Sequence, residues 1–251
     1  RLGFVHRERR RFVDIEQCML MDPWINDTLA QLQGRCDETT QLSLRYGASS
    51  GSWLIQPTLS NPGIPLKSGQ KHYQEEVGGV TFRVAASSFF QVNIEQAEVM
   101  AGVVRDSLRL SGREIVVDAY AGVGTFAALL APYASKVIAL EESASAVQDA
   151  SENLSPFPNV VMRQGKTEKI LAEMDEAVDA VVLDPPRAGC QRQALDSLMR
   201  LAPARITYIS CDPATLARDL KILTSGPYRI DAVQPVDMFP QTHHVECVAT
   251  L

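Results

Sequence analysis

The chain carries two different patterns of hydrophobic and polar positions, and the pattern changes near residue 86. Before that point, apolar and polar residues alternate in short runs separated by glycine, serine and proline, which is typical of half-buried antiparallel strands. The dipeptide Gly78-Gly79 suits a tight hairpin turn, and residues 23–33 have helical spacing. The alternating runs are residues 41–46, 52–56, 72–77 and 80–84. We therefore expect residues 1–86 to form a small antiparallel α+β domain.

From residue 87 onward, short and continuously apolar runs alternate with helical stretches, the first of which covers residues 94–110. The apolar runs are residues 115–118, 137–140, 160–162, 180–183 and 206–210, followed by two closing runs at 228–233 and 245–251. Strands that are buried on both faces and spaced by helices are typical of a parallel sheet covered on both sides. The pattern predicts an α/β fold with a doubly wound, mostly parallel sheet over residues 87–251.

Composition and charge exclude several classes of protein. The 251 residues are 45% hydrophobic and 22% charged, as in most soluble globular chains, and no apolar run approaches the roughly 18 residues of a membrane span. A net charge of −6 argues against a polycation that coats nucleic acid. The N-terminus is a local exception, because it holds Arg1, Arg7, Arg9, Arg10 and Arg11 against the single Glu8. This segment is either a solvated end or an arm that contacts phosphates.

The five cysteines predict a reducing, intracellular compartment, which is the cytoplasm or the interior of an organelle. Their number is odd, they form no CxxC pair, and a chain of this size does not need disulfides for stability. The cysteine and histidine spacings do not match a zinc site. The first residues lack an initiator Met and the apolar core of a signal peptide, so we expect a fragment of a longer protein. We also expect a monomer.

A glycine-rich loop follows the first apolar run and reads Asp118-Ala-Tyr-Ala-Gly-Val-Gly-Thr-Phe126. Gly122 and Gly124 allow a sharp turn at the carboxyl edge of the sheet, where open α/β sheets bind ligands. The glycine spacing fits the dinucleotide fingerprint of an NAD-dependent oxidoreductase, and it fits S-adenosylmethionine equally well. Asp118 favours the methyl donor, since a carboxylate repels a pyrophosphate and attracts a sulfonium. Glu141, at the end of the next run, suits the two ribose hydroxyls.

Three further polar residues lie at the ends of predicted strands. Asp184 precedes Pro185-Pro186, which fix the backbone and remove two amide donors, and Arg187 then stands where an amino-group methyltransferase would carry an aromatic residue. Cys211 lies directly before a helix N-terminus, a position that we expect to lower the pKa of its thiol. Glu246 opens the last apolar run, and its spacing leaves open whether it is solvated or faces Cys211.

This set of groups suits methylation of carbon 5 of uracil, which is a poor nucleophile on its own. A thiolate that adds to carbon 6 makes carbon 5 nucleophilic, and a base must later remove the carbon 5 proton so that the thiolate leaves. Cys211, Glu246 and Asp184 match the nucleophile, the base and the group that holds the uracil edge. The target nucleotide must be flipped out of its stack to reach them.

The sequence resembles the RNA uracil-5-methyltransferases, a family that includes tRNA thymidine-54 enzymes and 23S rRNA enzymes. The resemblance runs from residue 13 to Leu251 and rests on motifs at residues 13–18, 88–93, 118–126, 184–189, 210–213 and 237–246. It implies a class I methyltransferase (Rossmann-like) fold, S-adenosyl-L-methionine as methyl donor, and structured RNA with a flipped-out uridine as substrate. The motif around Cys18 and the Pro240-Gln-Thr-His-His ending favour ribosomal RNA over tRNA.

The resemblance also implies roles for single residues. Cys211 corresponds to the nucleophile and Glu246 to the proton-abstracting base. The implied donor-site residues are Gln91, Asp118, Tyr120, Gly122, Gly124, Thr125, Glu141 and Asp184. Thr125 stands where the family often has Asn, and residues 163–167 offer no acid that matches the family's adenine-binding position.

The same resemblance bears on metal binding. Cys18 resembles the last of four cysteines that hold an iron–sulfur cluster in the rRNA-type enzymes. The other three would lie upstream, together with a small β-barrel that binds oligonucleotides. One cysteine cannot hold a cluster that needs four thiolates, so we expect no metal in this chain and a cluster only in a longer protein.

Three alternatives remain at this point. The first is a tRNA uridine-54 methyltransferase with the same mechanism. The second is an RNA-binding module with an idle catalytic core, which the basic N-terminal segment favours. The third is an NAD-dependent oxidoreductase, which rests on the glycine loop alone.

Overall fold

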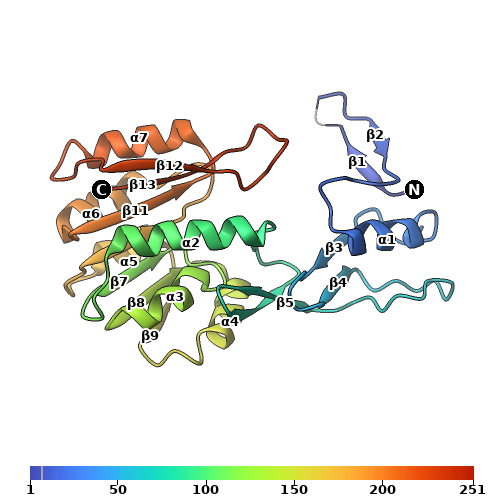
Figure 1. The fold of residues 1–251 in the computed structure, drawn as a ribbon, viewed down its shortest axis with the longest axis horizontal. Helices are drawn as coiled ribbons and strands as arrows, with labels where there is room; N and C mark the ends of the chain where they lie inside the picture. Colours follow the sequence, from blue (N-terminus) through green and yellow to red (C-terminus); the bar gives the residue numbers. More distant parts are fainter. Residues whose placement is uncertain (7) are drawn as a thin grey trace. The chain divides into compact units, whose positions relative to one another are not determined.

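A computed structural model describes residues 1–6 and 8–251 of the chain (Figure 1). Arg7 of the basic segment lies outside the described residues. The chain divides into two compact units. The first consists of Arg1–Glu76 and Arg83–Ala86, and the second consists of Val77–Phe82 and Ser87–Leu251.

The first unit contains one helix and short antiparallel strands. The helix α1 (Pro23–Leu32) begins after Asp22, whose side chain caps it by accepting a hydrogen bond from the Trp24 backbone N–H. Strand β3 (Ser43–Tyr46) pairs with β4 (Trp53–Gln56), and β1 (Gly3–Val5) pairs with β2 (Phe12–Asp14). Leu32, Cys36 and Ile55 form the buried core of this unit.

The hairpin predicted around Gly78-Gly79 is confirmed. It joins β5 (His72–Val77) to β6 (Val80–Ala85). The two glycines have φ angles of +58° and +77°, and two consecutive positive φ values are what a two-residue hairpin turn of the I′ type requires. Glycine therefore determines the turn at this place.

The second unit is built on a sheet of seven strands in the order β12-β13-β11-β10-β7-β8-β9. Five strands run parallel, and β13 is antiparallel to both β11 and β12. The strands are β7 (Ile115–Ala119), β8 (Lys136–Glu141), β9 (Val160–Gln164), β10 (Ala180–Leu183), β11 (Arg205–Ser210), β12 (Ala232–Val236) and β13 (Glu246–Thr250). The predicted doubly wound, mostly parallel sheet is thus confirmed.

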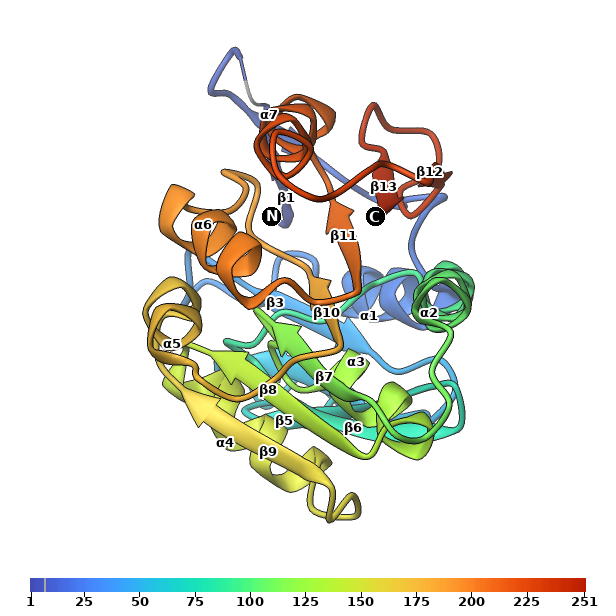
Figure 2. The same cartoon turned by 90° about the vertical axis from the view of Figure 1, so that its left-hand side faces the viewer.

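Helices cover both faces of this sheet, with α2 and α3 on one side and α5, α6 and α7 on the other (Figure 2). The helices are α2 (Ile94–Leu108), α3 (Thr125–Leu130), α4 (Ala144–Asn153), α5 (Thr167–Glu173), α6 (Arg192–Leu201) and α7 (Pro213–Leu223), and a 3₁₀ turn, η1 (Ala131–Tyr133), follows α3. Buried side chains recur at helical spacing, as at Ala97, Met100 and Val104 of α2. All four residues of β10 are buried, and burying one leucine contributes roughly 1.5–3 kcal/mol.

One predicted strand was misplaced. The apolar run at residues 228–233 was expected to be a strand, but β12 begins at Ala232. The Tyr228 ring packs against the apolar core, and its hydroxyl donates to the carbonyl oxygens of Leu198 at 3.3 Å and Pro203 at 3.1 Å. Tyr228 therefore anchors a loop, and the strand that follows contains Pro235, which is tolerated because β12 is the edge strand of the sheet.

Among the described residues, no helix is both long and apolar enough to cross a membrane.

Candidate active site

Four polar residues of the second unit gather at the carboxyl edge of its parallel strands. Asp118 is in β7, Glu141 ends β8, Asp184 follows β10, and Cys211 follows β11. Parallel strands place their carboxyl ends on one edge, which is where open α/β sheets bind ligands. The predicted site residues on four separate strands are therefore brought to one side of the molecule.

The last strand brings Glu246 to Cys211. Strand β13 is antiparallel to β11, with Cys247 opposite Ser210, so that Glu246 and Cys211 are the next residues beyond this pair, and the charge of Glu246 acts on the Cys211 thiol. Opposite residues of an antiparallel pair project from the same face with Cβ atoms about 4.5–5.5 Å apart. Glu246 is 6% exposed, and burial raises the pKa of its carboxyl while Arg187 lowers it. The sequence alone left this residue undecided between solvent and the thiol.

The expected activation of Cys211 by a helix N-terminus is wrong. Burial and the charge of Glu246 raise the pKa of the Cys211 thiol, and Arg187, followed by the backbone N–H of Cys211, lowers it. The reason lies in the next residue, because the Asp212 carboxylate accepts hydrogen bonds from the N–H groups of Ala214 at 2.9 Å and Thr215 at 3.0 Å. The amides at the start of α7 thus face Asp212 and do not stabilise the thiolate.

Asp184 is half-buried beside other acids. Burial, followed by the charges of Glu246 and Asp118, raises its pKa to about 8. The carboxyl is therefore mostly protonated at neutral pH and can both donate and accept a hydrogen bond. Its backbone N–H donates to the Ala119 carbonyl oxygen at 3.3 Å, which fixes the residue against the end of β7.

The glycine loop is held by Glu141 and remains open at one position. The Glu141 carboxylate accepts from the Gly122 N–H at 2.8 Å and from the Ser143 N–H at 2.7 Å. Gly122 has a φ of +56°, and a Cβ atom there would meet nothing within 4 Å. Gly124 differs, because a Cβ atom would lie 2.9 Å from the Leu154 side chain. Gly122 leaves room for a ligand, and Gly124 is needed for packing.

Two buried oxygen atoms of predicted donor-site residues have no hydrogen-bond partner among the residues that the structure describes: Oδ1 of Asp118 in β7 and Oε1 of Gln91 in the segment before α2. The other oxygen of Asp118 accepts from the Ala127 N–H at 2.8 Å, so Asp118 also caps α3. Burial, followed by the charge of Glu141, raises the pKa of Asp118 to about 7. A buried polar atom without a partner costs about 1–3 kcal/mol, and such atoms are typical of ligand sites.

The remaining predicted donor-site residues lie around the same loop. Thr125 is the first residue of α3. Tyr120 has a φ of +65°, its ring packs against the apolar core, and burial together with the nearby Cys190 raises the pKa of its hydroxyl. A contact of Tyr120 with the methyl donor stays a prediction.

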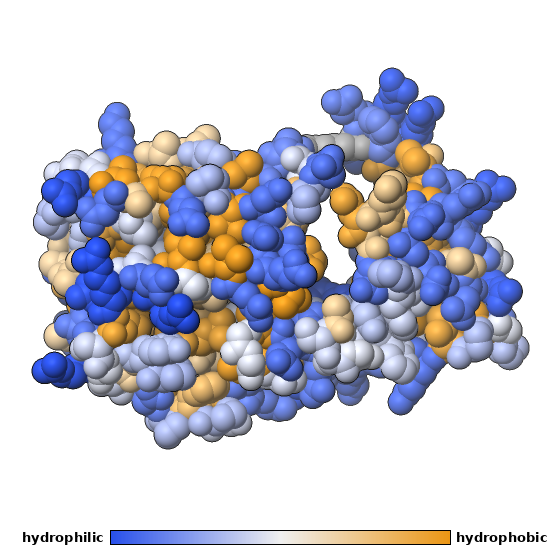
Figure 3. Space-filling model, in the orientation of Figure 1, coloured by the Kyte–Doolittle hydropathy of each residue, from blue (hydrophilic) through white to orange (hydrophobic). Residues whose placement is uncertain are grey.

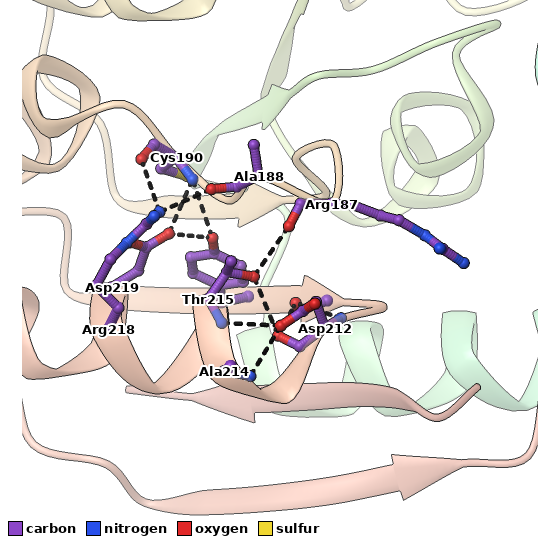
Figure 4. Close-up of polar contacts among 10 residues, drawn as sticks. Arg187, Ala188, Cys190, Asp212, Ala214, Thr215, Arg218 and Asp219 are labelled. Atoms are coloured by element: carbon purple, nitrogen blue, oxygen red, sulfur yellow. Dashed lines mark hydrogen bonds and ion pairs between the residues drawn. The ribbon is translucent and has the colours of Figure 1, made fainter. Parts of the chain in front are cut away.

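Two features of the site were not predicted. The first is Arg187, whose charge lowers the pKa of both Cys211 and Glu246. Its Nη2 lies 3.1 Å from Nδ1 of His244. The second feature is a buried polar cluster around Asp219 that contacts the loop after Asp184 (Figure 4). The position of Arg187 directly after the two prolines was the sequence signal for the first feature. The Asp219 cluster has no such signal, because its residues are far apart in the sequence.

Cys18 lies in the first unit, where its backbone N–H donates to Asn26 Oδ1 at 2.9 Å. All five cysteines are free thiols. Within residues 1–6 and 8–251, three or more metal-ligating side chains do not come together at any place.

Comparisons with known proteins identify the family and support the fold. Residues 167–251 match the family model for tRNA (uracil-5-)-methyltransferase. Two RNA methyltransferases of uncharacterized specificity align over 99% of the chain and 67% of their own length. One is from Thermosynechococcus vestitus, at 35% identity, and the other is from Halalkalibacterium halodurans, at 41% identity. The chain thus spans about two thirds of the length of these curated relatives.

A solved structure is also similar. The tRNA (uracil-54, C5)-methyltransferase of Pyrococcus abyssi, in complex with S-adenosyl-L-homocysteine, aligns with a TM-score of 0.80 at 26% identity over 96% of this chain and 70% of that one. The resemblance inferred from the motifs is confirmed. The chain belongs to the RNA methyltransferases and carries, over residues 167–251, the domain of the uracil-5-methyltransferase family.

Proposed function

We propose that the protein transfers a methyl group from S-adenosyl-L-methionine to carbon 5 of a uridine in RNA. The observation that carries this proposal is the antiparallel register that sets Cys211 opposite Glu246, with Asp184 at the neighbouring strand end. A nucleophile, a base and a neutral carboxyl are the three groups that the reaction needs. Membership of the uracil-5-methyltransferase family supports the same chemistry.

The predicted donor-site residues fit the methyl donor. The partnerless oxygen atoms of Asp118 and Gln91 are acceptors for an ammonium or other donor groups, and Glu141 is held in place by two backbone amides to accept from ribose hydroxyls. The space at Gly122 lets a ligand approach the backbone. When bound, S-adenosylmethionine supplies an electrophilic methyl group on a positively charged sulfur. The complex of the Pyrococcus abyssi relative with S-adenosyl-L-homocysteine supports this assignment.

In the proposed reaction, the Cys211 thiolate adds to carbon 6 of the uracil, and the electron pair of the ring double bond moves toward carbon 5 and oxygen 4. Carbon 5 then attacks the methyl group, and the methyl–sulfur bond of the donor breaks. Glu246 takes the proton from carbon 5, the bond between sulfur and carbon 6 breaks, and the thiolate is regenerated. Asp184 holds the uracil edge: it accepts from the N3–H of the uracil in either form, and it donates to oxygen 4 when protonated.

We propose ribosomal RNA of the 23S type as the substrate. The motif around Cys18 and the Pro240-Gln-Thr-His-His ending support this choice. tRNA is the second candidate, because the Pyrococcus abyssi relative acts on uracil-54 of tRNA. Labelled methyl donor offered with total rRNA and with total tRNA separates the two, and mapping of the labelled nucleotide identifies the uridine.

Residues 1–86 are proposed as the RNA-contacting part and residues 87–251 as the methyltransferase domain. In the first unit, β1 and β2 form a hairpin whose turn carries Arg9, Arg10 and Arg11 on the surface, with Phe4 56% and Phe12 51% exposed on its strands. Figure 3 shows hydrophilic side chains at the upper end of this hairpin and hydrophobic ones below them. Exposed arginines beside aromatic rings suit phosphates and unstacked bases.

RNA containing 5-fluorouridine tests the covalent step, because a base cannot remove fluorine as it removes a proton and the adduct therefore persists. We expect the wild-type protein to form a stable adduct in the presence of S-adenosylmethionine. Cys211→Ala should form none, and Cys18→Ala, which alters a free cysteine of the first unit, should form it at the wild-type rate. An adduct in Cys211→Ala, or none in the wild type, would refute the proposed function. RNA binding without methyl transfer would instead favour an RNA-binding module with an idle core.

A further inference from the structure

A buried carboxylate in α7 collects three hydrogen bonds. Oδ2 of Asp219 accepts from the Tyr208 hydroxyl at 2.6 Å and from the Cys190 backbone N–H at 2.8 Å. Oδ1 accepts from Nε of Arg218 at 2.8 Å. The Asp219 side chain is 1% exposed, so these donors replace water completely.

The same face of α7 holds the loop that follows Asp184. Nη2 of Arg218 donates to the Ala188 carbonyl oxygen at 2.8 Å, and the Thr215 hydroxyl donates to the Arg187 carbonyl oxygen at 3.1 Å. With the bond from Cys190 to Asp219, three loop positions are tied to one helix (Figure 4). The Arg187 side chain points away from this cluster, so only its backbone is held by the helix (Figure 4).

The loop also passes unusually close to the carboxylate. Gly189 has a φ of +75°, and a Cβ atom there would lie 2.5 Å from Oδ2 of Asp219 and 2.6 Å from Nη2 of Arg218. Only glycine permits this approach, so the path of the loop and the position of Asp219 depend on each other.

The two elements that Asp219 joins carry the reactive groups. Helix α7 begins two residues after Cys211, and the loop begins at Asp184 and carries Arg187. Strand β11, which ends just before Cys211, contributes Tyr208 to the cluster. The cluster therefore fixes how far the loop lies from the thiol.

We propose that Asp219 is a positioning residue for the methyl transfer proposed above: by holding the loop over residues 185–190 against α7 and Tyr208, it keeps Arg187 directed at Cys211. Asp219 does not itself touch the uridine or the donor. The inference rests on the proposed function, because it concerns the reactivity of the Cys211 thiol in that reaction.

Loss of this positioning should change how the rate of adduct formation depends on pH. Of the charged side chains that act on Cys211, Glu246 from β13 raises the pKa of the thiol, as burial does, and Arg187 from the loop lowers it; the backbone N–H of Cys211 lowers it as well. If the loop is no longer held by Asp219, Arg187 no longer lowers the pKa of the Cys211 thiol, whereas Glu246 still raises it. The rate of adduct formation should then reach its plateau at a higher pH.

Asp219→Asn tests the inference, measured as the single-turnover rate of adduct formation with 5-fluorouridine RNA and S-adenosylmethionine between pH 6 and pH 9. We expect a decrease of about 10-fold or more at pH 7, since small displacements of reacting groups cost up to about 100-fold, and a profile shifted toward higher pH. Affinity for S-adenosylhomocysteine should stay within about twofold, because the donor-site residues other than Asp184 lie on β7, β8, the glycine loop with the start of α3, and the segment before α2.

Two further variants complete the experiment. Tyr208→Phe keeps the ring and removes a single hydroxyl, so it is the milder variant and keeps the test open if Asp219→Asn does not fold. It should show a smaller change in the same direction. Glu176→Gln is the matched control, because this carboxylate pairs with Lys136 at 2.6 Å and with Arg163 and precedes β10, at the opposite edge of the sheet. It should leave the rate and the pH profile unchanged.

The outcomes are distinguishable. A wild-type adduct combined with unchanged rates and pH profiles in Asp219→Asn and Tyr208→Phe overturns the positioning role alone. A lower melting temperature with an unchanged adduct rate does the same, since it would leave Asp219 a merely structural residue. A wild-type protein that forms no adduct overturns the proposed function, and this inference with it.

Discussion

At the scale of single residues, Asp118 combines a cost in stability with a proposed role in binding. Burial raises its folded-state pKa to about 7, well above the value of 3.8 for a free aspartate. The unfolded chain therefore loses this proton first, and the free energy of unfolding should decrease as the pH rises from about 4 to about 7, by up to about 1.4 kcal/mol per pH unit.

Asp118→Asn removes this penalty because the amide is neutral at every pH. We expect the melting temperature of the variant, relative to wild type, to be higher at pH 8 than at pH 5. Its affinity for S-adenosylhomocysteine should fall about 10-fold, since the acceptor for the donor's ammonium is weakened. Thermal unfolding at both pH values and calorimetric titration measure the two effects. An equal shift in melting temperature at both pH values would contradict the assigned ionisation.

Sequence position was enough to select the candidate site residues but not to predict their protonation. Asp184 and Cys211 were singled out because they follow apolar runs, and the structure has both at strand ends. The charge state depends on neighbours that the local pattern does not contain. The pKa of Cys211 is raised by Glu246, 35 positions away in sequence, and the adjacent Asp212 takes the helix amides that were expected to lower it.

At the scale of elements, the β1–β2 hairpin is the proposed RNA contact. Replacing Arg9, Arg10 and Arg11 together with alanine removes three exposed cations from its turn. Because each neutralised phosphate releases about one counterion, we expect weaker RNA binding and a plot of log affinity against log salt that is shallower by roughly 2–3. Methyl transfer to a saturating RNA concentration should persist.

The matched control removes three exposed cations of the second unit, Arg109, Arg113 and Lys221, which lie before β7 and in the last turn of α7. This triple variant has the same net charge as the hairpin variant. An equal loss of affinity and of salt dependence in both would show that total charge, and not the hairpin, governs RNA binding.

The elements most visible in the sequence were those with the most burial. Strand β10 was predicted with its observed bounds because all of its residues are apolar and buried. Strands β1 and β2 were not predicted, since they have three residues each and mostly exposed side chains, which leaves neither a periodic pattern nor a long apolar run. The misplaced edge strand β12 has the same cause, because four of its five residues are exposed.

At the scale of the whole molecule, the active site depends on topology that local patterns do not specify. The buried apolar runs predict a parallel sheet, and a parallel sheet places Asp118, Asp184 and Cys211 at the same edge. The antiparallel direction of β13 could not be predicted from local patterns, and it is this strand beside β11 that brings Glu246 to the thiol. A parallel last strand would have placed Glu246 at the opposite edge.

The same edge holds four acids, Asp118, Glu141, Asp184 and Glu246, and this makes donor binding depend on pH. With pKa values of about 7 and about 8, Asp118 and Asp184 are largely protonated below pH 7, and a sulfonium cation nearby favours their ionised forms. S-adenosylmethionine should therefore bind more tightly as the pH rises from 6 to 8.5, by up to about tenfold per pH unit for each proton released. S-adenosylhomocysteine lacks the sulfonium charge, so its affinity should rise less steeply.

Calorimetric titration of both ligands in two buffers of different ionisation enthalpy measures the proton release directly. Asp184→Asn should flatten the part of the S-adenosylmethionine curve near pH 8 and leave the part near pH 7, because each carboxyl contributes where it titrates. Parallel curves for the two ligands would mean that the sulfonium does not lie beside these acids. The proposed place of the donor at this edge would then be wrong, even if the thiol forms its adduct with RNA.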